Sequence, residues 1–119
     1  MQKVNIADKL ALFTEHWSPK VVGAVDDYEI KVVKLQGDFV WHAHDDEDEM
    51  FLVIDGHLTI RLRDGVVDLG PGEFFVVPKG VEHQPTAAEE CQVLLFERKS
   101  VINTGKAEDP RTVREPERL

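Results

Sequence analysis

The segment from Trp41 to Gly56 combines two histidines and an acid at a spacing that could bind a metal ion. His42 and His44 lie two residues apart, and Glu49 follows five residues later, ahead of an apolar run. In a β-strand, residues i and i+2 point to the same face, so the two imidazoles would be aimed at one point. Imidazole and carboxylate groups are the usual protein ligands of divalent transition metals. This segment therefore predicts a metal site.

A second segment, from Gly72 to Ala87, could bring a third imidazole to the same place. Pro78 would end a strand, and Gly80 would allow the backbone to turn back. His83 would then follow directly after the turn, at a fixed point beyond the end of the strand. We therefore include His83 among the candidate metal ligands.

Together, the two segments resemble the motifs of the cupin superfamily. The first motif, G-x5-H-x-H-x(3,4)-E-x6-G, matches Gly37 to Gly56, with a leading gap that is one residue short. The second motif, G-x5-P-x-G-x2-H-x3-N, matches from Gly72 onward, except that Ala87 replaces the final Asn. The resemblance implies a small single-domain jelly-roll barrel, the cupin double-stranded β-helix, with a metal inside it. Carried over position by position, the metal ligands would be His42, His44, Glu49 and His83.

The expected ligand set indicates what such a site could do. Three neutral imidazoles and one carboxylate around a divalent ion would give a formal charge of about +1 and leave roughly one or two coordination positions open. Open positions suit catalysis, whereas a closed tetrahedron suits a structural role. The ligand types leave the identity of the ion open among Fe, Mn, Ni, Zn, Co and Cu.

We therefore expect a metal-dependent enzyme that acts on a small organic molecule, an isomerase or a dioxygenase. The alternatives are a non-catalytic module that binds or senses a small molecule, and a barrel without metal that serves only in interactions. No second carboxylate or histidine can be assigned to the barrel interior from the sequence, so no general base is named.

Short apolar runs separated by turn residues predict an all-β fold with about eight strands. Asp55-Gly56 and Asp64-Gly65 favour type I′ turns, which join adjacent strands into tight hairpins. The expected strands are Val21–Val25, Tyr28–Leu35, Phe39–His44, Glu49–Ile54, His57–Arg63, Val66–Leu69, Phe74–Val77 and Gln92–Glu97.

The length of 119 residues suits one domain, with a core at about residues 20–98. Residues 1–19 would form a short amphipathic helix and an arm, because Ile6, Leu10 and Phe13 recur at helical spacing. Asn5 could cap this helix, with Asp8 three residues later. Residues 99–119 form a polar tail that is either an extension packed on the surface or a partly disordered segment.

Several expected strands are apolar on both faces, which has a consequence for assembly. In Glu49–Ile54, Phe51 shares one face with Glu49 and Val53, while Met50 lies on the other face. A strand with two apolar faces is covered on both sides. The second cover would be the N-terminal helix or another subunit, and we expect a homodimer.

The charge balance restricts the possible partners and the compartment. The chain has 23 acidic and 14 basic residues, for a net charge of −9. This balance argues against nucleic acid and against anionic membrane surfaces. Cys91 is the only cysteine, and the N-terminus lacks the apolar core of a signal peptide. The expected setting is the cytoplasm, with a small molecule as the ligand.

Two arginines and two histidines outside these motifs are expected at the surface. Arg61 and Arg63 alternate with apolar residues that belong in the core, so the two guanidinium groups would point outward. They would not bind an anionic substrate inside the barrel. His16 and His57 lie outside any spaced cluster of ligands.

Overall fold

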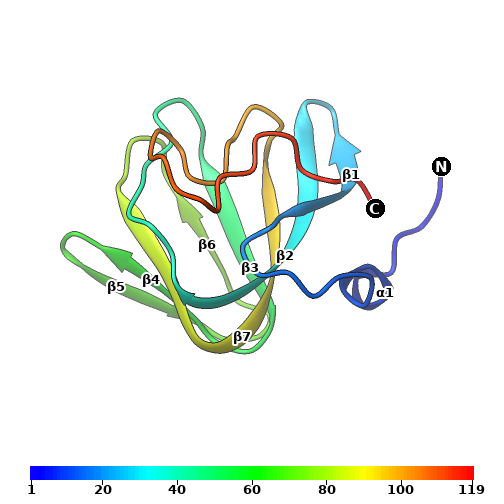
Figure 1. The fold of residues 1–119 in the computed structure, drawn as a ribbon, viewed down its shortest axis with the longest axis horizontal. Coiled ribbons are helices and arrows are strands. Elements are labelled where there is room, and N and C mark those ends of the chain that lie inside the picture. The colour runs from blue at the N-terminus through cyan, green and yellow to red at the C-terminus, as the bar shows by residue number, and fades with distance from the viewer.

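The computed structural model describes residues 1–119 and contains one short helix and a seven-stranded sheet that curves around a central interior (Figure 1). This architecture confirms the predicted all-β fold with a single N-terminal helix. The elements are α1 (Ile6–Leu10), β1 (Lys20–Val25), β2 (Tyr28–Asp38), β3 (Glu49–Asp55), β4 (Leu58–Leu62), β5 (Gly65–Leu69), β6 (Phe74–Val77) and β7 (His83–Arg98). The helix spans only five residues, far short of the roughly 20 needed to cross a bilayer.

Strand β7 connects the β4–β5 pair to the rest of the sheet. All strand pairs are antiparallel, and the main path of the sheet runs β1-β2-β7-β3-β6. The first residues of β7 pair with β4, and its remaining length pairs with β2 and β3. Because β4 also pairs with β5, the 16 residues of β7 join the β4–β5 pair to β2 and β3.

The prediction of a strand at Phe39–His44 was wrong. Strand β2 instead continues to Asp38, past a bulge next to Gly37, whose φ is 83°. After Asp38 the chain crosses the end of the barrel, where its only ladder contact is an isolated bridge between His42 and His83. Residues 39–48 meet β7 only at its start, where the amide of Phe39 also donates to the carbonyl of Pro85, so the segment forms no extended ladder. We call residues 39–48 the histidine segment.

Strand β7 is also longer than the predicted Gln92–Glu97. Its first half lacks a continuous apolar run, because Glu89 and Glu90 are exposed. Alternate residues in this half, such as Pro85 and Ala87, are nevertheless buried. The pattern is therefore that of a strand with one buried and one open face.

Two separate clusters of apolar side chains hold the fold together. The larger cluster fills the barrel and includes Val53, Leu58, Ile60 and Val93. The smaller cluster joins α1 to the outer face of β1 and β2, and its buried members are Leu10, Phe13, Val22 and Val32. Asn5 caps α1 as predicted, with its side-chain oxygen accepting a hydrogen bond of 2.9 Å from the amide of Asp8.

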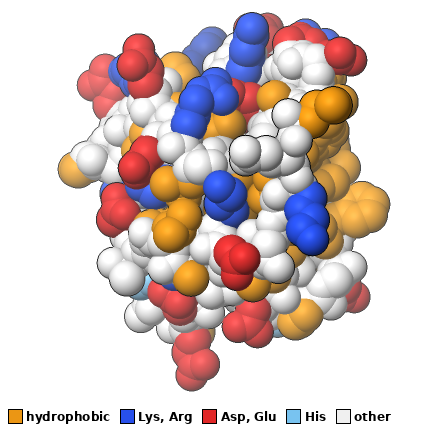
Figure 2. Space-filling model, turned by 90° about the vertical axis from the view of Figure 1, so that its right-hand side faces the viewer, with side chains coloured by type: hydrophobic (Ala, Val, Ile, Leu, Met, Phe, Trp, Pro, Cys, Tyr) orange, Lys and Arg blue, Asp and Glu red, His pale blue; other side chains and the backbone are white.

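The cluster beneath the helix reaches β1, β2 and Ile54 of β3, but the rest of the outer face of β3 and β6 keeps exposed apolar side chains. Phe74 and Val76 are 61% and 42% exposed, and Met50 and Leu52 beside them are half-buried. We call these four residues the β3–β6 outer face. Figure 2 shows exposed hydrophobic side chains among scattered charged groups, most densely along the right-hand margin of the view.

The polar tail from residue 99 packs against the barrel. At the end of the tail, the amide of Leu119 donates a hydrogen bond of 2.9 Å to the carbonyl of Val21 on β1. Further back, Thr104 is fully buried, and the Arg111 guanidinium donates to the carbonyl of Asp38. Of the two alternatives for the tail, the structure shows the packed extension.

Gly105 in this tail fixes the backbone of the histidine segment. Its φ is +59°, and a Cβ at this position would collide with the carbonyl of Ala43, between His42 and His44. We expect Gly105→Ala to lower the free energy of unfolding by more than about 2 kcal/mol, because backbone strain and a backbone collision add together. Chemical denaturation measures this loss.

Gly72→Ala is the matched control for this prediction. Gly72 has a φ of +81°, but a Cβ there would meet nothing within 4 Å. This variant carries only the backbone strain, about 1 kcal/mol. Equal losses in the two variants would contradict the close approach of Gly105 to Ala43.

Candidate metal centre

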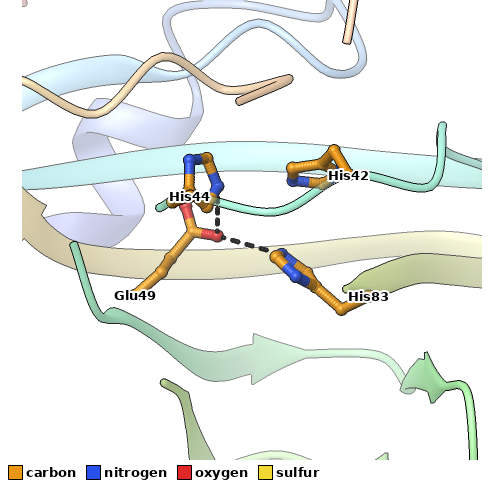
Figure 3. Close-up of side chains that lie close together, drawn as sticks. All are labelled: His42, His44, Glu49 and His83. Atoms are coloured by element: carbon orange, nitrogen blue, oxygen red, sulfur yellow. Dashed lines mark ion pairs between the residues drawn. The ribbon is translucent and has the colours of Figure 1, made fainter. Parts of the chain in front are cut away.

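The four residues predicted as metal ligands come together inside the barrel (Figure 3). One nitrogen or oxygen from each residue lies within 4.8 Å of the corresponding atom of every other. All four side chains are buried, with 5% exposure or less. The residues concerned are His42, His44, Glu49 and His83.

Different elements supply these side chains. Glu49 is the first residue of β3, and His83 is the first residue of β7. The other two imidazoles come from the histidine segment, which is tied to β7 by paired backbone hydrogen bonds of 3.1 and 2.9 Å between His42 and His83. The carbonyl of His44 also accepts a hydrogen bond from the amide of Gly80 at 2.8 Å. The turn before β7 thus anchors the histidine segment.

Backbone carbonyls orient two of the imidazole rings. Nδ1 of His42 donates to the carbonyl of Val40 at 2.8 Å, and Nδ1 of His83 donates to that of Val81 at 2.9 Å. A proton on Nδ1 leaves the lone pair on Nε2, which is the tautomer that a metal ligand requires. Both rings are therefore held in a form that is ready for coordination.

The buried atoms at the centre of the site lack protein hydrogen-bond partners. Nε2 of His44, Oε1 of Glu49 and Nε2 of His83 are all buried without one. Oε1 of Glu49 lies 3.3 Å from Nε2 of His44 and 3.5 Å from Nε2 of His83 (Figure 3). Ligands about 2 Å from one ion lie about 3 Å apart when the angle between them is near 90°. The donor set and its spacing thus fit a divalent transition-metal ion.

The environment separates the pKa values of these groups. Burial, together with the neighbouring His83, lowers the pKa of His42 to about 4. Burial also opposes protonation of His44, but the carboxylate of Glu49, whose Oε1 lies 3.3 Å away, outweighs burial and raises the pKa of His44. The pKa of Glu49 is well below its usual range despite burial, because the imidazoles of His44 and His83 lie within 3.3 and 3.5 Å of its Oε1 and favour the carboxylate anion. The site therefore contains a carboxylate anion and a neutral His42 at neutral pH.

A second acid in the barrel was missed from the sequence. Glu97 on β7 lies opposite Glu49 on β3 and is buried, and Nζ of Lys31 is 3.3 Å from its Oε1. Burial and the charge of Glu49 raise the pKa of Glu97 well above its usual range. The sequence did carry a signal, because alternation places Glu97 on the same face as Val93 and Leu95. No second carboxylate was assigned to the barrel interior from the sequence, and the structure places Glu97 there.

A small cavity of about 30 Å³ lies beside the metal centre. His42 and Glu49 line one side of it, so an open coordination position would face this space. The other walls are mainly apolar and include Trp17, Val33, Leu35, Phe39, Phe51 and Leu95. The arrangement provides a mainly apolar site that is bordered by two candidate ligands.

The arginines and the other histidines lie outside this site, as predicted. Arg61 is 3.7 Å from the carboxylate of Asp38, and Arg63 is 3.1 Å from that of Glu82, all in exposed positions. The remaining histidines pair with acids at the surface, His16 with Glu90 and His57 with Asp68. None of these groups reaches the metal centre.

Comparison with known proteins defines the class of this protein. The cupin domain family model matches residues 30–97, more than half of the chain, and the chain belongs to this family. A crystal structure of a cupin-2 domain containing protein from Shewanella frigidimarina NCIMB 400 is 49% identical, with a TM-score of 0.79, covering 80% of this chain and 93% of that one.

Two further relatives are similar over most of their lengths. Protein NMB1881 from Neisseria meningitidis is 31% identical, with a TM-score of 0.75, covering 82% of this chain and 99% of that structure. The uncharacterized protein YdbB from Bacillus subtilis (strain 168) is 28% identical over 90 residues, which cover 75% of this chain and 80% of that protein. The chain is thus a small cupin with a buried His/Glu group that could hold a metal ion.

Proposed function

We propose that this cupin binds one divalent transition-metal ion and acts as a metal-dependent enzyme on a small organic molecule, of the isomerase or oxygenase type. The proposed ligands are His42, His44, Glu49 and His83. The observation that carries this proposal is the convergence of three buried donor atoms without any protein hydrogen-bond partner. Buried polar atoms in native proteins are rarely left without a partner, so an ion at their centre accounts for all three.

The residues around the site have separable roles in this proposal. A bound ion supplies Lewis-acid chemistry toward a substrate oxygen. Glu49 offsets part of the positive charge, and the carbonyls of Val40 and Val81 keep two imidazoles in the coordinating tautomer. The apolar walls would contact the hydrocarbon part of a substrate in the space next to His42.

Turnover by the metal-loaded protein tests this proposal. Protein reconstituted with Fe, Mn, Co, Ni or Zn should convert at least one member of a panel of small carbonyl compounds and acids. The activity should disappear in the His42→Ala His44→Ala variant. Saturable binding with persistent absence of turnover in fully loaded protein would contradict the enzyme and support the alternative, a non-catalytic module that binds or senses a small molecule.

We also propose that two copies of the chain associate through the β3–β6 outer face. The four side chains of this face are apolar, so two copies could bury them against each other. Light scattering at micromolar concentration should give the mass of a dimer. Phe74→Asp should give a monomer, whereas Val66→Asp, at a 60% exposed position on β5, should not. A monomeric mass for the unmodified chain would contradict the dimer.

The proposed setting is the cytoplasm, with neither nucleic acid nor membrane as a partner. Cys91 is buried and has no other cysteine with which to pair, which suits a reducing compartment. The net charge of −9 disfavours polyanionic partners.

A further inference from the structure

The walls of the cavity beside the metal centre restrict what can bind there. We infer that the site takes a short oxygen-donor anion with a hydrocarbon body, and excludes phosphorylated and polyhydroxylated molecules. This inference rests on the proposed metal binding, because the ion would hold the oxygen donor. It follows from four features of the site: its wall, its rim, the placement of nearby cations and its size.

The wall offers apolar contact and no hydrogen bonds. Val33, Leu35 and Leu95 come from β2 and β7, and the rings of Phe39 and Phe51 complete the lining. All five side chains are buried. A hydroxyl placed against such a wall loses its hydrogen bonds to water and gains none, which costs about 1–3 kcal/mol for each group. A sugar would carry several such groups.

The polar side chain at the rim is already engaged. Asn103 lines the cavity, but its Nδ2 donates to the carbonyl of Arg111 at 2.9 Å. Its Oδ1 accepts a hydrogen bond from the amide of Val113 at 2.8 Å. The side-chain amide of Asn103 therefore holds the tail in place. It leaves a ligand without a hydrogen-bond partner at the rim of the cavity.

The nearby cations are neutralised by other groups. Lys31 is buried, and its Nζ lies 3.3 Å from Glu97 and 3.9 Å from Glu29. Arg111 packs on Phe39, with its guanidinium carbon 4.8 Å from the ring centroid, and pairs with Asp109 at 2.8 Å. Neither side chain lines the cavity. A phosphate group needs a bidentate arginine or a lysine beside it, and this site provides neither.

Charge and size define the ligand further. A divalent ion with Glu49 carries a formal charge of about +1 in a poorly solvated cavity, and one anionic oxygen donor would neutralise it. The cavity of about 30 Å³ admits only a small body beside the ion. A carboxylate or an enolate with a short hydrocarbon chain satisfies both conditions.

Ligand binding to the cobalt-loaded protein tests this inference. Cobalt content is measured first by elemental analysis, and the visible spectrum of Co²⁺ then reports titrations with propionate, inorganic phosphate, D-glucuronate and 1-propanol. We expect propionate to perturb the spectrum with a Kd at least tenfold lower than that of each other probe. Phosphate or glucuronate binding as tightly as propionate would overturn the inference, and so would an unchanged spectrum with propionate.

Two near-isosteric variants distinguish the effect of the cavity wall on propionate binding from a general effect of the substitution on the fold. Val33→Thr places one hydroxyl on the wall of the cavity and should weaken propionate binding about tenfold at unchanged cobalt content. Val76→Thr, on the β3–β6 outer face, should leave the Kd unchanged. Equal effects of both variants would contradict the role of the wall. Absence of bound cobalt would overturn the proposed metal binding as well, whereas bound cobalt with another ligand preference would overturn only the inferred ligand class.

Discussion

Replacing both His42 and His44 by alanine is expected to abolish metal binding. The unmodified chain, purified without an affinity tag, should contain about one equivalent of Fe, Mn, Co, Ni, Cu or Zn. The double variant removes two of the four donor atoms and leaves Glu49 and His83, too few to hold an ion in competition with water. We expect its content to fall below about a tenth of an equivalent. Elemental analysis of both proteins measures this difference.

The control for this experiment uses the histidines at the surface. The His16→Ala His57→Ala variant also loses two imidazoles, but these side chains pair with acids outside the barrel. Its metal content should equal that of the unmodified chain. A full equivalent of metal in the His42→Ala His44→Ala variant, or equal losses in both variants, would place the ion elsewhere.

The stability of the metal-free protein is expected to fall as the pH is lowered from about 6.5 to about 4. The pKa of His42 is about 4 in the folded state, against 6.5 as its ordinary value. Between pH 6.5 and about 4, His42 is protonated in the unfolded chain but stays neutral in the folded protein, so a lower pH favours unfolding. The difference corresponds to about 3 kcal/mol, lost progressively as the pH falls through this window. Guanidinium denaturation in the presence of a chelator measures the free energy of unfolding at each pH.

The variant His42→Gln isolates this contribution. His44 acts in the opposite direction, because its raised pKa adds stability that is lost as the pH rises. Both the unmodified chain and the His42→Gln variant retain His44, so its contribution cancels when their free energies of unfolding are compared. The variant should show a clearly flatter dependence on pH between about 4 and 6.5. Parallel curves for the two proteins would contradict a neutral, buried His42.

The same protons compete with the metal. Imidazole ligands must be neutral to bind, so metal occupancy should decrease as the pH falls below about 6. Equilibrium dialysis followed by elemental analysis measures the occupancy. An unchanged occupancy at about pH 4.5 would contradict ligation by histidine.

The sequence predicts the candidate ligands because each of them belongs to a local spacing pattern. The i, i+2 spacing of His42 and His44 and the Pro-x-Gly-x-x-His pattern before His83 are short-range signals. Strand β3 follows its alternation throughout, with Glu49, Phe51 and Val53 all buried. The outward direction of Arg61 was predicted on the same basis. Where a strand has one face in the core, period two determines the direction of every side chain.

The histidine segment shows the limit of local patterns. Residues 39–44 alternate like a strand, but a strand also needs a partner along its length, and only Phe39 and His42 form backbone hydrogen bonds with β7. The contact of Gly105 with Ala43 and the pairing of Glu97 with Glu49 join residues that are far apart in the chain. Such contacts depend on the closure of the barrel, which no short window of sequence specifies. The tail was therefore left undecided, although it forms part of the rim of the site.

The candidate ligands differ in how firmly backbone hydrogen bonds hold their segments, and this difference would govern how the centre releases its ion. His83 belongs to β7, which is hydrogen-bonded to three strands, whereas His42 and His44 belong to a segment outside the strands that is tied by one isolated bridge and by single backbone hydrogen bonds at Phe39 and His44. Regions with fewer backbone hydrogen bonds open at lower free energy, so amide hydrogen exchange should be fastest in this segment. An ion would leave by detachment of His42 and His44 first, while His83 stays in place. The rate of metal release would then be set by the opening of ten residues and not by the unfolding of the barrel.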